Sequence, residues 1–203
     1  MGNDLNSDAW VAPVILRGEH VILEPLRIDH AAGFGDAAAD GELWRCWYTN
    51  VPMPGAVEEY IASALKMQEA GDALVFSVRD AAGDLVGTTR YYDLDVAVPR
   101  LSIGYTWYAQ RAQRTGLNTE AKLLLLAHAF ETLGCIAVAF ETSSFNHASR
   151  TAIARLGAKQ DGILRSHKRH ADGSVRDTVV FSIIDSEWPV VKRNLLARLA
   201  EHG

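Results

Sequence analysis

Residues 101 to 127 read LSIGYTWYAQRAQRTGLNTEAKLLLLA, and this stretch decides the fold. Its first part, residues 102–108, alternates between apolar and polar side chains in the manner of a β-strand. A polar loop from Ala109 to Gly116 follows, with two arginines and no acidic residue. Apolar residues then recur at helical spacing and predict a helix with one apolar face. These residues are Leu123, Leu126, Ala127, Phe130 and Leu133. A loop that brings backbone N–H groups to the positive end of a helix dipole predicts an anion site, such as one for phosphate.

Length and composition limit what the chain can be. Its 203 residues suffice for one domain with a full hydrophobic core. The formal net charge of −5 disfavours general binding to nucleic acid, which needs a basic surface. The first ten residues lack the charged region and the apolar region of a signal peptide. No apolar run reaches the ~18 residues of a membrane span. The two cysteines, Cys46 and Cys135, have no metal-ligand spacing around them. We therefore expect a cytoplasmic protein with no nucleic-acid partner, no membrane partner and no metal.

The rest of the chain predicts strands and helices in mixed order. Strands are expected at residues 20–25, 74–79, 85–94, 136–142, 162–169 and 175–184. Helices are expected at residues 30–36, 57–69 and 147–156 and from residue 186 or 187 onward, with Asn146 as an N-cap and Gly157 as a stop. No linker divides the chain, so we expect a lead-in of residues 1–15 and a single domain of residues 16–203. The expected class is α+β, with a mixed, mostly antiparallel twisted sheet of about seven strands flanked by helices.

Two motifs on these elements resemble those of a known family. The loop Gln113-Arg114-Thr115-Gly116-Leu117-Asn118 is similar to the acyl-CoA pyrophosphate loop of the GNAT acyltransferase superfamily, whose pattern is Gln/Arg-x-x-Gly-x-Gly/Ala. Asn118 stands where that pattern has a small residue. The run from Asn146 to Ser149, followed by Leu156-Gly157-Ala158, resembles the family's Asn-x-x-Ser helix and its stop. The sequence Thr119-Glu120-Ala121 resembles the branch of ribosomal-protein alanine N-acetyltransferases.

The resemblance implies a sheet that splays between its fourth and fifth strands and binds acetyl-CoA or coenzyme A in the opening. Backbone amides of the loop would hold the pyrophosphate, Arg111 or Arg114 would add charge, and the pantetheine arm would pair with residues 105–108. The residues implied for cofactor binding are Tyr105, Thr106, Trp107, Tyr108, Gln113, Arg114, Thr115, Gly116, Leu117, Asn118, Thr119 and Asn146.

The resemblance also implies catalytic and acceptor residues. Acyl transfer to an amine needs a deprotonated amine, a stabilised oxyanion and a proton for the leaving thiolate. Family members of this branch place a serine at the position of Ser149, so we expect Ser149 to be the general acid or to orient the thiol, and support of the Asn146 cap is the alternative. Glu141 is the candidate base, although acids at strand ends also serve solubility. The expected acceptor pocket, for which core packing is the alternative, contains Trp44, Trp47, Tyr48 and Tyr91.

The expected function is acyl-CoA-dependent N-acyl transfer, with acetyl as the group moved. The acceptor would be the primary amine of a protein N-terminus, a peptide or a small molecule, attacking directly in a ternary complex. Two alternatives stay open: an acyltransferase with another acyl donor or acceptor type, and a non-catalytic CoA-binding sensor or interaction protein. Formation of a homodimer through the last strands or the C-terminal helix also stays open. The sequence contains no Gly-x-x-x-x-Gly-Lys-Ser/Thr and no Gly-x-Gly-x-x-Gly, which argues against P-loop and dinucleotide-binding proteins.

Overall fold

A computed structural model describes residues 10–170 and 172–201, and every structural statement below concerns these residues. Eight strands form one sheet in the order β1-β2-β3-β4-β5-β6-β8-β7. All neighbouring strands pair antiparallel except β5 and β6, which run parallel. The strands are β1 (Leu16–Arg17), β2 (Val21–Pro25), β3 (Ala73–Asp80), β4 (Leu85–Asp95), β5 (Arg100–Tyr108), β6 (Ala137–Ser143), β7 (Lys159–Arg169) and β8 (Val175–Ile184). The predicted α+β class is confirmed, with one strand more than expected because β1 is only two residues long.

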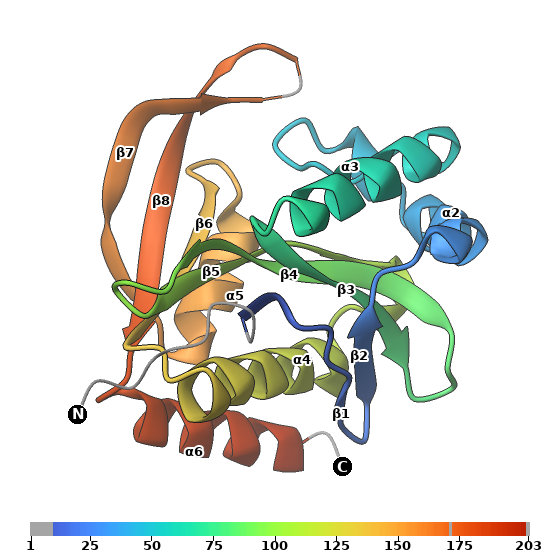
Figure 1. Cartoon of the computed structure of the whole chain (residues 1–203). Helices are drawn as coiled ribbons and strands as arrows, with labels where there is room; N and C mark the ends of the chain where they lie inside the picture. The colour runs from blue at the N-terminus through green and yellow to red at the C-terminus, as the bar shows by residue number, and fades with distance from the viewer. Residues whose placement is uncertain (1–9, 171, 202–203) are drawn as a thin grey trace.

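Helices cover both faces of the sheet (Figure 1). On one face lie α2 (Ala31–Ala39) and α3 (Val57–Glu69), and on the other lie α4 (Gly116–Ala127) and α6 (Trp188–Ala200). The remaining helix, α5 (His147–Leu156), packs against β6, β8 and α6. None of these helices is long and apolar enough to cross a membrane.

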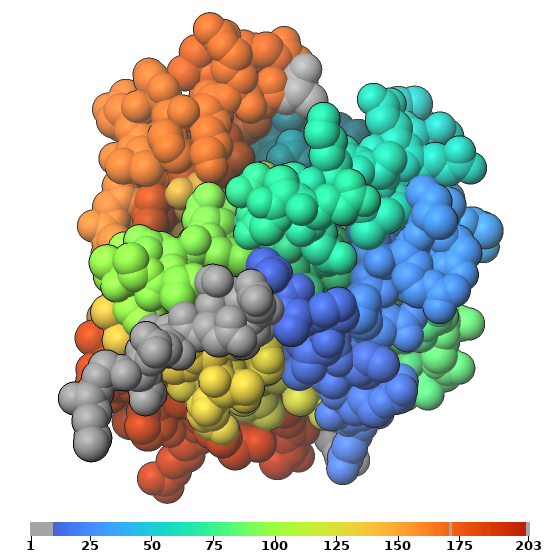
Figure 2. Space-filling model, viewed as in Figure 1, coloured from blue at the N-terminus to red at the C-terminus, as the bar shows by residue number. Residues whose placement is uncertain are grey.

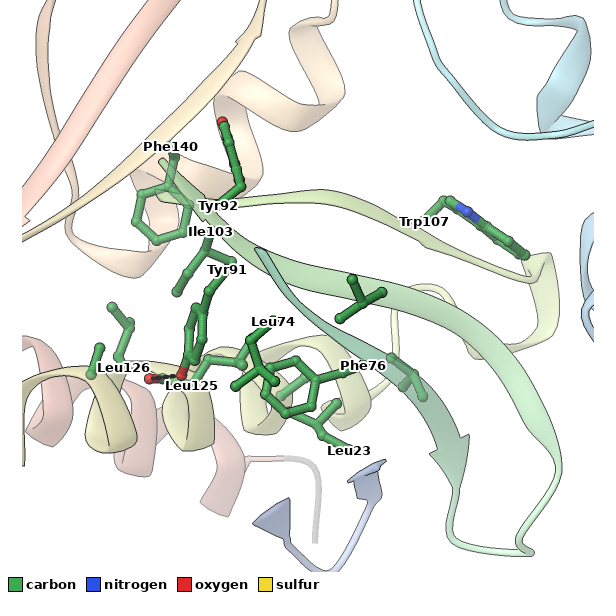
Figure 3. Close-up of a cluster of buried hydrophobic side chains, with 14 of the residues drawn as sticks. Leu23, Leu74, Phe76, Tyr91, Tyr92, Ile103, Trp107, Leu125, Leu126 and Phe140 are labelled. Carbon is green, nitrogen blue, oxygen red and sulfur yellow. Dashed lines mark hydrogen bonds between the residues drawn. The ribbon is translucent and has the colours of Figure 1, made fainter. Parts of the chain in front are cut away.

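The core lies between the sheet and α4. Neighbouring residues of β4 point to opposite faces, so Tyr91 faces α4 and Tyr92 faces the other side (Figure 3). Tyr91 is fully buried, and its hydroxyl donates a hydrogen bond to the Leu125 carbonyl oxygen at 2.7 Å. The predicted apolar stripe lies to one side of the most buried face of α4, since Leu126 and Leu133 are buried but Leu123, Ala127 and Phe130 are only half-buried. The most buried apolar residues of α4 are Leu117, Ala121, Leu125 and Leu126.

Glu120 ties α4 to the start of the sheet. Its carboxylate accepts hydrogen bonds from the backbone amides of Glu19, His20 and Val21 at 2.9, 2.6 and 3.0 Å. A Cβ atom on Gly18 would lie 2.2 Å from the Glu120 Cδ atom, so this turn has room only for glycine. The acidic residue that follows the loop motif therefore fixes the first turns of α4 against β2.

The predicted lead-in is described only in part. Residues 1–9 lie outside the described residues, and Trp10 is buried in the hydrophobic core. The domain boundary at residue 15 stays a prediction.

Candidate active site

The centre of the sheet opens where β5 and β6 diverge. The two strands pair only from Arg100 to Ser102 on β5 and from Ala137 to Ala139 on β6. A cavity of about 400 Å³ lies beyond this point, lined by residues 103–108 of β5 and 140–143 of β6. This volume is typical of small-molecule sites. The predicted splay is therefore present, between strands that become the fifth and sixth once β1 is counted.

The cavity is bounded by elements that are distant in the sequence. Tyr60 of α3 lines one side of it, and Arg176 of β8 lines the other. Figure 2 shows a recess in the surface between α3 and the β7–β8 hairpin.

A β-bulge interrupts β5 beside the opening. The pairs Thr88–Trp107 and Arg90–Gly104 enclose one residue on β4 but two on β5, and one of these two, Tyr105, has a φ of 51°. A bulge leaves backbone groups out of the ladder and re-aims them. Backbone N–H groups of this segment are therefore available to a ligand.

The turn before α4 presents further backbone donors. Thr115 is the helix N-cap, and its Oγ1 accepts a hydrogen bond from the Leu117 amide at 3.2 Å. The amides of Arg114 and Gly116 have no acceptor within the described residues, and Arg114 has a φ of 60°. Asn118 lies in the first turn of α4 with a helical backbone, so its side chain causes no strain there. This turn is suited to hold an anion at the helix N-terminus.

The two arginines of the loop have different roles. Arg111 donates to the Asp40 carboxylate at 3.2 Å and to the Leu85 carbonyl oxygen at 3.3 Å. Arg114 instead lines the cavity. Gln113 also lines the cavity, and its side-chain amide donates to the Tyr108 carbonyl oxygen at 3.0 Å, which fixes the loop to the end of β5. Of the two arginines, Arg114 is therefore the one placed to contact an anionic ligand.

The predicted residues of α5 both line the cavity. The Asn146 Oδ1 atom accepts a hydrogen bond from the Ser149 amide at 3.0 Å, so Asn146 is a helix N-cap. This cap uses the Ser149 backbone and leaves its hydroxyl without a partner among the described residues. Ser149 is half-buried in the cavity wall and keeps a hydroxyl that could act on a ligand.

Glu141 also lines the cavity, but its carboxylate is already engaged. The Lys168 ammonium donates to Glu141 Oε2 at 2.6 Å, and the Glu141 side chain is 15% exposed. One carboxylate oxygen is thus held by a partner on β7.

Of the four predicted aromatic acceptor residues, two are in contact, since the Trp47 and Tyr48 rings lie 5.5 Å apart, but the four do not form one pocket. Tyr48 lines the cavity, whereas Trp44 and Trp47 do not. Trp47 is 46% exposed, and its ring lies 4.7 Å from that of His170 on the opposite side of the recess. Tyr91 lies in the core against α4, because alternation along β4 turns it away from the cavity.

The residues predicted to bind the cofactor fall into two groups, those that line the cavity and those that do not. Four of them do not line it, namely the N-cap Thr115 and the first-turn residues Gly116, Leu117 and Thr119 of α4. The others line it, namely Tyr105, Thr106, Trp107, Tyr108, Gln113, Arg114, Asn118 and Asn146. Two buried polar atoms here, the Tyr108 hydroxyl and the Trp107 indole nitrogen, have no hydrogen-bond partner among the described residues.

Lys122 is a cavity residue that the sequence analysis missed. It is 6% exposed, and its Nζ atom donates to Thr106 Oγ1 at 3.2 Å. Burial lowers the pKa of Lys122 to about 7. The sequence signal was a lysine one helical turn after Asn118, but a lysine in a helix is usually taken to face water.

Cysteine chemistry finds no support in the described residues. Burial raises the pKa of the Cys135 thiol to about 12, and neither Cys135 nor Cys46 lines the cavity.

Within residues 10–170 and 172–201, no cluster of three or more histidine, cysteine, aspartate or glutamate side chains could hold a metal ion.

The fold and the splayed cavity are those of acyltransferases of the GNAT type. A family profile described as "Acetyltransferase (GNAT) domain" matches residues 20–159, and the chain belongs to this family. It is accordingly an acetyltransferase enzyme by family, as predicted from the two motifs.

Solved structures agree with this assignment. A GCN5-related N-acetyltransferase from Brucella melitensis is 30% identical with a TM-score of 0.84, covering 92% of this chain and 85% of its own. A protein from T. thermophilus that is named as an acetyltransferase is 31% identical with a TM-score of 0.82, covering 94% and 99%. Mycobacterium smegmatis RimJ, solved with CoA-disulfide, shares the fold at 22% identity with a TM-score of 0.75, covering 92% and 93%. No curated protein matches the chain.

Proposed function

We propose that this enzyme transfers an acetyl group from acetyl-CoA to a primary amine by direct attack in a ternary complex. The observation that carries the proposal is the unpaired edge of β5, which lines the same cavity as Arg114 of the donor-rich turn and Ser149 of α5. The complex of RimJ with CoA-disulfide supports CoA as the ligand of this opening. The acceptor would be a protein N-terminus, a peptide or a small molecule.

Several groups of the cavity have a task in this reaction. Amides of the turn and Arg114 bind the pyrophosphate, and the edge of β5 pairs with the pantetheine amides. Backbone N–H groups at the bulge stabilise the oxyanion, and the Ser149 hydroxyl protonates or orients the leaving thiolate. Direct attack needs no enzyme nucleophile, which agrees with a cavity lined by no cysteine among the described residues.

A thiol-release assay with acetyl-CoA and a panel of amines, peptides and aminoglycosides tests the function. Release of free CoA that depends on one class of amine, with an acetylated product in the mass spectrum, identifies the acceptor. A parallel series of longer acyl-CoA donors tests the acyl group. Tight CoA binding without release across the whole panel would contradict the proposal and favour a non-catalytic CoA sensor.

The two loop arginines provide a matched pair of variants for the donor site. We expect Arg114→Ala to raise the KM for acetyl-CoA by about tenfold, since loss of one charge-assisted hydrogen bond costs about 1.4 kcal/mol. Arg111→Ala removes the same charge from a residue bound to Asp40 and should leave this KM within twofold. Equal effects of the two substitutions would contradict the assigned phosphate contact.

A further inference from the structure

Lys122 is a charged residue on the buried side of α4, a helix rich in leucine. It is 6% exposed and lies on α4, one turn after Asn118, where both residues line the cavity. Its ammonium group forms no ion pair with any described carboxylate, and Thr106 is its one hydrogen-bond partner there. A buried unpaired lysine lowers the free energy of unfolding. Such a residue is more readily explained by chemistry than by stability.

Polar contacts hold the Lys122 amino group at the bulge of β5. Thr106 Oγ1 accepts from Lys122 Nζ at 3.2 Å and lies 2.7 Å from Thr89 Oγ1. The Lys122 Nζ atom also lies 6.0 Å from the centroid of the Tyr108 ring. These contacts place the amino group under the bulge, whose N–H groups the proposed function assigns to the oxyanion.

The charged and titratable groups around the cavity leave Lys122 without a counter-ion among the described residues. From β5, Tyr105 and Tyr108 line the same cavity, and from the loop Arg114 does so. On β6 Glu141 is held by Lys168, and on α4 the neighbouring Glu120 binds backbone amides of the β1–β2 turn. The other titratable lining groups are Tyr48, Tyr60 of α3 and Arg176 of β8, and α5 contributes none. Burial alone accounts for the lowered pKa of Lys122.

We propose that Lys122 is the proton carrier of the acyl transfer: its neutral amine takes the proton that the attacking amine loses, and returns it to the departing thiolate. The inference rests on the proposed function and supplies the base that the sequence left without a firm candidate. A C–N bond forms, the C–S bond breaks, and one proton passes from the acceptor nitrogen through Lys122 to sulfur. Of the two tasks proposed for the Ser149 hydroxyl, orienting the thiolate is then the one that remains. The lysine ends each cycle in the neutral form in which it began, so no other reactant is needed.

The protonation state agrees with this task. With a pKa of about 7, the Lys122 amine exists in both forms near neutral pH, which suits a group that must accept and release a proton. An ordinary lysine, with a pKa of ~10.4, would stay charged and could not act as a base.

Three variants and the wild type test the inference by kcat, by the pH dependence of kcat/KM and by the Kd of CoA. We expect Lys122→Met to lower kcat about 100-fold, as for the loss of a general acid–base group, with the Kd of CoA within twofold. Lys122→Arg keeps the charge but cannot lose a proton, so it should be as inactive as Lys122→Met. Lys66→Met removes an exposed lysine of α3 and is the matched control, with unchanged kcat.

The outcomes separate the two proposals. Wild-type activity should rise with pH through about 7, and this limb of the profile should be lost in Lys122→Met. Full activity of Lys122→Arg, or a loss confined to CoA affinity, would overturn the proton-carrier role and leave the acetyltransferase function standing. A wild type that releases no thiol with any amine would overturn both.

Discussion

The three hydrogen bonds that Glu120 accepts from backbone amides predict a large loss of stability in Glu120→Ala. Hydrogen bonds to a charged group contribute ~1.5–3 kcal/mol each, so the gross loss is about 4.5–9 kcal/mol. The amides of Glu19 and His20 can turn partly to water, whereas that of Val21 is buried. We therefore expect the free energy of unfolding to fall by about 3–5 kcal/mol, a large part of the 5–15 kcal/mol typical of a domain.

Urea denaturation followed by tryptophan fluorescence measures this loss, and thermal melting should show a decrease of about 10 °C in Tm. Glu120→Gln keeps one carbonyl oxygen but turns an NH₂ group toward an amide, so its loss should be intermediate. Glu69→Gln, at an exposed position near the end of α3, is the matched control and should change stability by less than ~0.5 kcal/mol. A loss below ~1 kcal/mol in Glu120→Ala would refute the view that this carboxylate anchors α4.

Four further predictions follow from the site and its surroundings. Ser149→Ala should cut kcat at least ~10-fold with little change in the Kd of CoA, and unchanged turnover would remove the Ser149 hydroxyl from the mechanism. Folding lowers the pKa of Lys122, so above pH 7 this lysine binds a proton in the unfolded chain but not in the folded one. The free energy of unfolding should therefore rise from pH 7 toward 10. Denaturation curves should show this rise in the wild type and a smaller one in Lys122→Met. Gly87 has a φ of 158°, and Gly87→Ala would place a Cβ atom 2.0 Å from the Trp107 carbonyl oxygen, so this variant should lower Tm measurably. Gly83→Ala is the control, because its Cβ atom would meet nothing within 4 Å and the variant reports the cost of a positive φ alone. Acetyl-CoA at 100 times its Kd should raise the free energy of unfolding by about 2.7 kcal/mol, and no shift in Tm would argue against binding.

Local signals predicted much of the fold. The bounds of α3 and α5 were predicted to the residue, and for α5 the reason is local: Asn146 caps one end, and Gly157 ends the other with a φ of 107°. The donor-rich turn was predicted from a polar loop directly followed by a helix, which is also a local signal. The splay joins two strands that are distant in the sequence, and it was predicted only through the family resemblance.

The features that were missed depend on contacts between distant segments. Glu120 and Lys122 have the polarity of surface residues, and only the β1–β2 turn and the bulge of β5 explain their burial. The bulge itself leaves no clear sequence signal, since Tyr105 is an ordinary strand residue with an unusual φ. Tyr91 could have been placed correctly, because neighbours in a strand face opposite sides and Tyr92 is the one that reaches Tyr105, with a ring separation of 5.2 Å.

The short pairing between β5 and β6 has a mechanical consequence. It divides the sheet into two plates, β1 to β5 and β6 to β8, which share a hinge of three residue pairs. A hinge this short resists bending less than a full ladder, so the width of the cavity depends on the angle between the plates as well as on the side chains that line it. We expect preference for acyl-chain length to respond to substitutions at the hinge, such as those at Leu101 and Val138, even though neither residue lines the cavity.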